Sequence, residues 1–177
     1  MPSGCSSWQP GTRAKHSGGV RVAARRRIEG VEVKRLISHA DERGHLTELL
    51  RRDDPIFETF GQAYYSVSYP GVIRGWHYHR KQTDYFSCLV GMIKVPLYDM
   101  REGSPTYGEI NEFFIGEDNR IVLKIPVGVL HGFKNIGVVP CVLVNFPTMP
   151  YDPADPDEYR IPWDSPDIPY DWNLTFT

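Results

Sequence analysis

The sequence has few cysteines and no long apolar run. Three cysteines occur among 177 residues, and Cys5, Cys88 and Cys141 lie far apart without a Cys-x-x-Cys spacing. This pattern argues against a disulfide framework or a zinc knuckle and fits a reducing cytoplasm, which is the expected location. No run of about 18 apolar residues is present, so no membrane span is expected. The formal net charge of −2 gives no reason to expect nucleic acid or a membrane surface as partner.

Acidic side chains are missing from the first 27 residues, which carry Lys and Arg but no Asp or Glu. The segment also lacks the continuous apolar core of a secretion signal. We therefore expect residues 1–27 to be a disordered basic leader, or to result from a start codon assigned too early. Residues 28–177 are expected to form a single domain, because that length is enough for one sizeable core.

Helical periodicity is scarce as well. Short apolar or alternating runs of strand length, such as AYYSVSY, MIKVPLYDM and RIVLKI, recur between turn signals such as YPG, GEDN and NIG. Many short strands with regular breaks predict an all-β sandwich or barrel, with at most one short helix near residues 51–60. Residues 147–177 are dense in Pro and Asp and are predicted to wrap the barrel as an extended tail, anchored by Tyr151, Trp163 and Trp172.

The stretch GVIRGWHYHRKQTDYFSCLVG, residues 71–91, holds the first candidate site. Alternate side chains of a strand share a face, so His77 and His79 are predicted to point the same way. Gln82 and Asp84 share a face for the same reason, and His131 follows a later turn. If these faces meet inside the barrel, three imidazoles and a carboxylate converge. They could then bind a metal, transfer protons or form a structural polar cluster.

The spacing of these residues resembles that of the cupin superfamily. Its first motif (Gly, five residues, His-x-His, three or four residues, an acid, six residues, Gly) is met by Gly71, His77, His79, Asp84 and Gly91. Its second motif, Pro-x-Gly-x-x-His-x-x-x-Asn, is met within residues 126–135, although the Gly that usually opens it is absent. The resemblance implies a jelly roll. It also allows one divalent transition metal (Fe, Mn, Ni, Zn or Cu) on His77, His79, Asp84 and His131.

A closer resemblance is to the dTDP-4-dehydrorhamnose 3,5-epimerase family, sugar-nucleotide enzymes of the jelly-roll cupin type. The stretches that carry it are DERGHLTEL at 41–49, GVIRGWHYH at 71–79, SPTYGE at 104–109, EDNR at 117–120, IPVGVLHGF at 125–133 and RIPWDSPDIPYDW at 160–172. The resemblance covers about residues 30–172. It implies epimerisation of a nucleotide-diphosphate sugar, most simply a dTDP-linked one. It also implies a site without cofactor or metal, and homodimers formed by strand exchange.

The family's reaction implies roles for several residues. A 4-keto group acidifies the hydrogens at C3 and C5, a base removes one of them, and an acid on the opposite face returns a proton. By resemblance, His77 is the base. In this chain Asp84 or His79 would have to orient it. Arg43 and Arg74 correspond to the arginines that bind the diphosphate. Contacts to the sugar and its surroundings are assigned to Gln62, Gln82, His131, Asn145 and Tyr151.

The chain departs from the family pattern at four positions. Asp84 stands where the family has a lysine near the keto oxygen, and Asn145 stands where it has the tyrosine acid. His79 replaces a glutamine, and the aspartate that orients the base has no counterpart in this sequence. A nearby tyrosine would then have to act as the acid. The candidates are Tyr64, Tyr65 and Tyr151, and Tyr65 is the one we assign.

Three interpretations remain open on sequence alone. The first is a metal-free epimerase or ketoisomerase of a nucleotide-linked 4-keto sugar. The second is a metal-dependent cupin that acts on a sugar or another small substrate, in which a metal-bound His77 could not also be the base. The third is a non-catalytic cupin that binds a sugar nucleotide. The third is disfavoured because a buried polar cluster without a task costs free energy.

Overall fold

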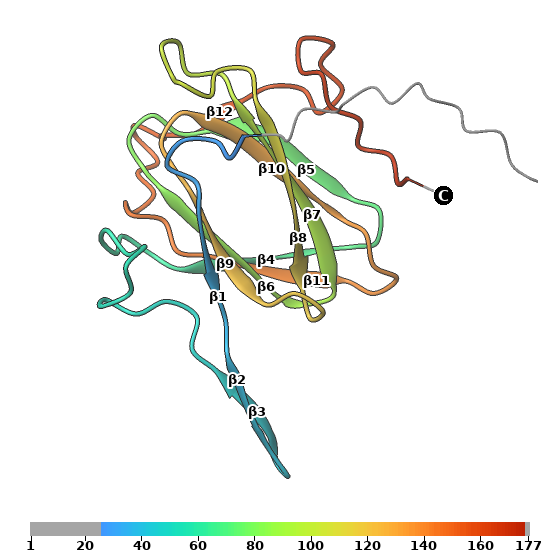
Figure 1. Ribbon diagram of the computed structural model, residues 1–177. Helices are drawn as coiled ribbons and strands as arrows, with labels where there is room; N and C mark the ends of the chain where they lie inside the picture. Colours follow the sequence, from blue (N-terminus) through green and yellow to red (C-terminus); the bar gives the residue numbers. More distant parts are fainter. Residues whose placement is uncertain (1–25, 176–177) are drawn as a thin grey trace, which may run out of the picture.

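A computed structural model describes residues 26–175 (Figure 1). The predicted basic leader therefore lies outside the described residues, apart from Arg26 and Arg27. Arg26 is hydrogen-bonded to the barrel through both its backbone and its side chain. Its carbonyl oxygen accepts a hydrogen bond from Asn111 Nδ2, and its guanidinium donates one to the Pro105 carbonyl oxygen. In the described part of the chain, no helix has the length and apolar character needed to cross a membrane.

The described residues form twelve β-strands and no helix. In chain order the strands are β1 (Glu32–Arg35), β2 (Ser38–Asp41), β3 (Gly44–Thr47), β4 (Tyr64–Ser68), β5 (Ile73–Tyr78), β6 (Asp84–Val90), β7 (Met92–Asp99), β8 (Ile110–Gly116), β9 (Ile121–Ile125), β10 (Val129–Asn135), β11 (Cys141–Asn145) and β12 (Tyr159–Arg160). Two five-stranded antiparallel sheets, β1-β9-β6-β11-β4 and β12-β5-β10-β7-β8, face one another as a jelly roll. The third sheet is the β2–β3 hairpin, which extends away from the barrel (Figure 1).

The alternating runs seen in the sequence coincide with strands, because each turn signal ends one strand before the next begins. The predicted helix near residues 51–60 is wrong. That segment contains isolated turns, in which the amides of Asp54 and Phe57 donate to carbonyls three residues earlier. Pro55 lacks the amide hydrogen that a continuing helix would require.

The main core lies between the two sheets and is built from aliphatic side chains of alternating positions, including Ile93, Val95 and Leu97 of β7, none of which is exposed. Burial of such side chains is the principal favourable term in folding. A second cluster lies on the outer face of β5 and β10, where Trp76 and Leu130 pack against Ile168 and Trp172 of the C-terminal segment.

The C-terminal segment is extended, and within the described residues β12 is its one strand. Trp172 is buried, with its ring 4.8 Å from that of Trp76 and its Nε1 donating to the Trp163 carbonyl. Trp163 and Tyr151, the other two predicted anchors, are more than half exposed. Trp172 is thus the predicted anchor that the packing supports.

Strands β5 and β10 approach each other unusually closely next to the histidines. A Cβ atom on Gly132 would lie 2.7 Å from both the Arg74 carbonyl oxygen and the Gly75 Cα. These are backbone atoms, so no side-chain movement could make room. Because Gly132 has no side chain, β5 and β10 can lie this close together. His131 is thereby placed directly opposite His77 on the paired strand.

Candidate functional site

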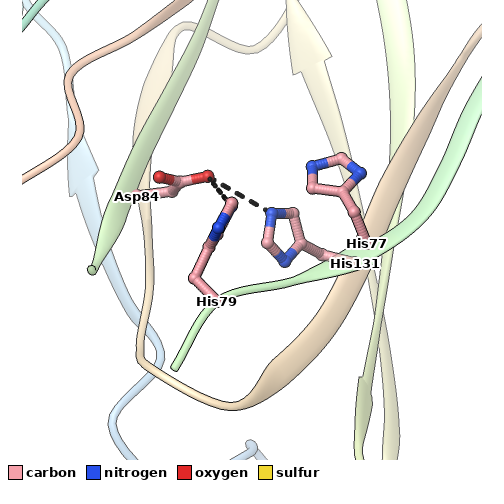
Figure 2. A group of neighbouring side chains, drawn as sticks. All are labelled: His77, His79, Asp84 and His131. Atoms are coloured by element: carbon pink, nitrogen blue, oxygen red, sulfur yellow. Dashed lines mark ion pairs between the residues drawn. The ribbon is translucent and has the colours of Figure 1, made fainter. Parts of the chain in front are cut away.

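Three imidazoles and one carboxylate meet at one end of the barrel. His77 lies near the end of β5, His79 directly follows that strand, and His131 belongs to the neighbouring β10. Asp84 opens β6 in the opposite sheet. The potential ligand atoms of all four side chains lie within 4.8 Å of one another, and Figure 2 shows the group facing a common centre. The predicted convergence of these side chains is thus what the structure contains.

The Asp84 carboxylate contacts two of the three imidazoles. Its Oδ2 atom is 3.2 Å from His79 Nε2 and 3.3 Å from His131 Nε2 (Figure 2). These two contacts lack hydrogen-bond geometry. Among the described residues, Asp84 Oδ2 and His131 Nε2 therefore have no hydrogen-bond partner. The other carboxylate oxygen, Oδ1, accepts a hydrogen bond of 2.9 Å from Gln82 Nε2. Asp84 therefore faces His79 and His131, and the predicted contact with His77 is not formed.

The outer nitrogens of the same two imidazoles meet backbone carbonyls. His79 Nδ1 is hydrogen-bonded to the Asp157 carbonyl oxygen, and His131 Nδ1 to the Val129 carbonyl oxygen at 2.9 Å. A carbonyl oxygen only accepts, so each Nδ1 carries the proton. Among the described residues no hydrogen bond to the His77 imidazole is formed, and its nearest aromatic neighbour is the His131 ring at 4.2 Å.

Burial and mutual charge shift the pKa values of these groups. Burial, helped by the neighbouring His131, lowers the pKa of His77 well below its usual value, which leaves a neutral imidazole. Burial alone would lower the pKa of His79, but the Asp84 carboxylate outweighs it and the pKa is raised. Burial would likewise raise the pKa of Asp84, but the close imidazoles of His131 and His79 lower it below the usual range.

Two adjoining cavities, of about 360 and 650 Å3, open beside this cluster. Tyr64, His77 and Glu158 line both of them. His79 lines the smaller cavity, whereas Asp84 and His131 lie behind the wall with 1% of their surface exposed. His131 is therefore placed to shape the cluster, and the sugar contact predicted for it is not supported by its position.

Of the two adjacent tyrosines of β4, Tyr64 lies at both cavities and Tyr65 lies at neither. Adjacent side chains of a strand point to opposite faces, and Tyr65, on the outer face of β4, is 69% exposed and lines neither cavity. The Tyr64 hydroxyl accepts a hydrogen bond of 3.0 Å from Asn145 Nδ2 on the paired strand β11. Burial raises the pKa of Tyr64 to about 12, so the phenol keeps its proton at neutral pH. Tyr151 lines the smaller cavity.

The predicted substrate contacts divide into those that reach the cavities and those that do not. Arg74 lines the larger cavity, where its Nε donates to Ser68 Oγ at 2.8 Å. Gln62 and Gln82 line the smaller one. Asn145 is fully buried behind Tyr64. Arg43 lies on the protruding hairpin, with 84% of its side chain exposed and a salt bridge to Asp41.

The contribution of the C-terminal segment to the site was not predicted from the sequence. Glu158 and Arg160 line the cavities, and the Asp157 carboxylate accepts hydrogen bonds from the backbone amides of residues 80, 81 and 82. This side chain fixes the turn that leads from His79 to Asp84. Lys81 also lines the smaller cavity and pairs with Asp155 at 2.6 Å. One available signal was the run DEYR at 157–160, which breaks the Pro-rich pattern.

An antiparallel jelly roll with histidines from adjacent strands facing an acid inside the barrel defines a protein of the cupin type. Comparison with known families then makes the assignment specific. The model of the dTDP-4-dehydrorhamnose 3,5-epimerase family matches residues 25–177, and the chain belongs to this family of sugar-nucleotide epimerases.

Two relatives are similar over nearly their whole length. The chain is 49% identical over 149 residues to the spore coat polysaccharide biosynthesis protein SpsL of Bacillus subtilis, covering 84% of this chain and 99% of the relative. It is 52% identical over 148 residues to a probable low-salt glycan biosynthesis epimerase of Haloferax volcanii, covering 82% and 95%.

Solved structures agree with the fold and the family. A dTDP sugar isomerase from Desulfovibrio desulfuricans superposes with a TM-score of 0.78 at 36% identity, covering 82% of this chain and 92% of that one. The dTDP-6-deoxy-D-glucose-3,5-epimerase RmlC of Legionella pneumophila, solved with dTDP-4-keto-L-rhamnose, gives a TM-score of 0.74 at 27% identity, with coverages of 85% and 82%.

Proposed function

We propose that the paired cavities bind a nucleotide-linked 4-keto-6-deoxyhexose, most simply a dTDP-linked one, and that the enzyme inverts a carbon next to the keto group. Family membership supports this reaction class. The observation that carries the proposal is the position of His77 and Tyr64, which line both cavities from opposite sheets. A sugar ring between them would have a base on one face and an acid on the other.

His77 suits the role of base. Its imidazole is neutral and free of hydrogen bonds to the described residues, so a ring nitrogen can accept the proton from C3 or C5. The electron pair left on carbon delocalises into the 4-keto group as an enolate. No net oxidation occurs, so the reaction requires no redox cofactor.

Tyr64 suits the role of acid, and it explains how the chain can manage with Asn145 at the family's tyrosine position. The Asn145 amide donates to the Tyr64 hydroxyl oxygen, so the phenol proton is left free to point into the cavity. A phenol thus reaches the same region from the neighbouring strand β4. Delivery of that proton to the face opposite His77 completes the inversion.

Arg74 and Arg160, both at the larger cavity, are proposed to bind the diphosphate. The Arg74 guanidinium already has two donors engaged by Ser68 Oγ and the Val67 carbonyl oxygen, which fixes its plane. Arg160 is paired with Glu158, and 76% of its side chain is exposed. A diphosphate would draw both cations by charge-assisted hydrogen bonds. The polysaccharide and glycan assignments of the two close relatives fit a role in supplying a deoxysugar for a cell-surface polymer.

Deuterium exchange tests the proposal. The enzyme is incubated with dTDP-4-keto-6-deoxyglucose in D2O, and deuterium at C3 and C5 is followed by NMR. We expect exchange with the wild type and none with His77→Ala. Tyr64→Phe should retain exchange but lose inversion by about 10²–10⁴-fold, the usual contribution of a general acid.

Tyr65→Phe provides the matched control, because the same atom is removed one residue away on the outer face. It should retain wild-type activity. A loss of inversion in Tyr65→Phe with normal Tyr64→Phe would overturn the assignment of the acid. Binding of the sugar nucleotide by the wild type without any exchange would reject the epimerase and favour the non-catalytic interpretation.

We also propose that the chain acts as a homodimer that exchanges the β2–β3 hairpin. The hairpin extends away from its own barrel (Figure 1). Leu46 on the hairpin is 64% exposed, and Ile37, the residue just before it, is 71% exposed. Arg43 at its tip would reach a partner's cavity, which its own barrel does not allow. Mixing Arg43→Ala with His77→Ala chains tests this idea, because a mixed dimer regains one intact site. Failure of the mixture to recover activity after unfolding and refolding together would contradict it.

A further inference from the structure

We propose that His79, Asp84 and His131 bind one divalent first-row transition metal ion, with His77 left outside the coordination sphere. This assignment departs from the metal-free site implied by the family resemblance. It also differs from the four-ligand site that the cupin motif allows. The assignment follows from the orientation of the two imidazoles, from two donor distances and from the hydrogen-bond partners of each ligand.

The orientation of the two imidazoles leaves lone pairs facing a carboxylate. His79 and His131 each use Nδ1–H for a backbone carbonyl, so in the neutral ring the Nε2 atom holds a lone pair. Both Nε2 atoms point at Asp84 Oδ2, which is itself an acceptor. Asp84 and His131 are 99% buried, and the facing atoms Oδ2 and Nε2 have no hydrogen-bond partner among the described residues. A metal ion between these three atoms would satisfy all of them at once, and their ligand atoms lie close enough together to share one.

The distances match the edge of a metal coordination polyhedron. Ligand nitrogens and oxygens lie about 2.0–2.1 Å from a transition metal, so two ligands of a tetrahedral ion are separated by about 3.3 Å, and adjacent ligands of an octahedral one by about 2.9 Å. The observed separations of 3.2 and 3.3 Å from Asp84 Oδ2 to the two Nε2 atoms fall in this range. Two imidazoles and one carboxylate suit Zn2+, Fe2+, Ni2+ or Mn2+, whereas Ca2+ and Mg2+ prefer all-oxygen sites.

Each proposed ligand has the outer partner that metal ligands usually have. His79 is held by the Asp157 carbonyl, His131 by the Val129 carbonyl, and Asp84 by the Gln82 amide. Such partners fix the tautomer and direction of a ligand before the metal arrives. His77 has no such partner within the described residues. This difference is why we assign three ligands and leave His77 available as the base.

The three ligands would hold the ion next to the smaller cavity, which His79 and His77 line. A metal there supplies Lewis acidity, which would take the place of the lysine that the chain lacks at Asp84. That catalytic role rests on the proposed function, whereas binding of the metal does not. The side chains of Asp84 and His131 stay behind the wall, so a substrate oxygen can reach the site only from the cavity.

Metal content without substrate is the primary test. The untagged chain is purified without chelators, and its metal is counted by inductively coupled plasma mass spectrometry. It is then stripped and titrated with Zn2+ or Co2+, with Mg2+ as the negative control. We expect near-stoichiometric binding of Zn2+ and Co2+ by the wild type, and a visible d–d spectrum with Co2+. His79→Ala, His131→Ala and the isosteric Asp84→Asn should lose the ion.

Two variants serve as controls. His45→Ala removes an exposed hairpin histidine and should bind metal normally. His77→Ala should also retain a full equivalent of Co2+, with a changed activity but an intact binding isotherm. Circular dichroism shows whether each variant is folded. If an alanine variant does not fold, the isosteric Asp84→Asn variant still tests the metal site.

The possible outcomes separate this inference from the proposed function. A stripped wild type that takes up neither Zn2+, Co2+ nor, anaerobically, Fe2+ overturns the metal site and leaves His77 and Tyr64 untouched. Loss of metal in His77→Ala overturns the three-ligand assignment and removes His77 as a free base. Bound metal together with absent deuterium exchange supports the metal site and rejects the epimerase.

Discussion

The close approach of β5 and β10 gives the sharpest prediction about the scaffold of the site. Substitution Gly132→Ala would place a methyl carbon 2.7 Å from the Arg74 carbonyl oxygen and from the Gly75 Cα. Carbon needs about 3.5–4.0 Å for a favourable contact, so the strands must separate by roughly 1 Å or the backbone must distort. Overpacking of this kind costs about 1–3 kcal/mol, and the upper half of that range applies because both neighbours are backbone atoms.

The assay is equilibrium unfolding in urea, followed by tryptophan fluorescence, because Trp76 and Trp172 pack beside this contact. We expect Gly132→Ala to lower the free energy of unfolding by about 2–3 kcal/mol, which corresponds to roughly 5–10 °C in melting temperature for a domain of this size. Activity should fall as well, because His131 and His77 pair across the same two strands.

Gly137→Ala is the matched control. A Cβ atom there would meet its nearest neighbour, Asn135 Oδ1, at 3.4 Å, which is an ordinary contact. We expect a change within about 1 kcal/mol. If Gly132→Ala and Gly137→Ala were equally stable, close strand approach would not be what positions the two histidines.

Two further predictions concern charge. Burial would raise the pKa of Asp99, but hydrogen bonds from Arg101, Ser104 and Thr106 lower it below the usual range. The ionised Asp99 carboxylate therefore stabilises the fold fully at pH values above its unfolded-state pKa, which is near 4. This stabilisation is lost as the pH falls from there through the lowered folded-state pKa. Asp99→Asn should lower the urea midpoint at pH 7 and flatten the acid decline, and identical pH profiles would contradict this. Arg74→Lys should weaken dTDP binding about tenfold in calorimetry, since a lysine lacks the planar fork; unchanged affinity would exclude a diphosphate contact.

Much of the fold could be predicted because strand periodicity is local. His77 and His79 alternate with Trp76 and Tyr78, and the structure places the indole and the phenol under the C-terminal segment and the imidazoles at the cavity side. The spacing of the cupin motif also predicted that Asp84 belongs to the cluster, and the structure places it there. These relations depend on which residues lie on the same strand or on adjacent turns, which a sequence displays directly.

Other features depend on contacts between distant segments, and sequence alone could not supply them. The choice between Tyr64 and Tyr65 depends on which face of β4 turns inward, and two adjacent tyrosines give the same pattern in either register. Which imidazoles Asp84 meets depends on how the two sheets are placed. Arg43 matched a family motif, yet its hairpin extends away from its own barrel, and Arg43 lines neither of the two cavities beside the histidines.

The hydrogen bond between His79 and Asp157 joins residues 78 positions apart in the chain, and Asp157 also binds the turn that follows His79. When β5 emerges during synthesis, the segment that orients His79 has not yet been made. The cluster can therefore adopt its final geometry only after the barrel strands and the C-terminal segment have both been produced and docked, a long loop closure that is slow compared with local strand pairing. Until then His79 lacks the backbone carbonyl to which its Nδ1–H donates in the folded protein. The proposed metal site is therefore expected to form only in the completed chain, after the C-terminal segment has docked.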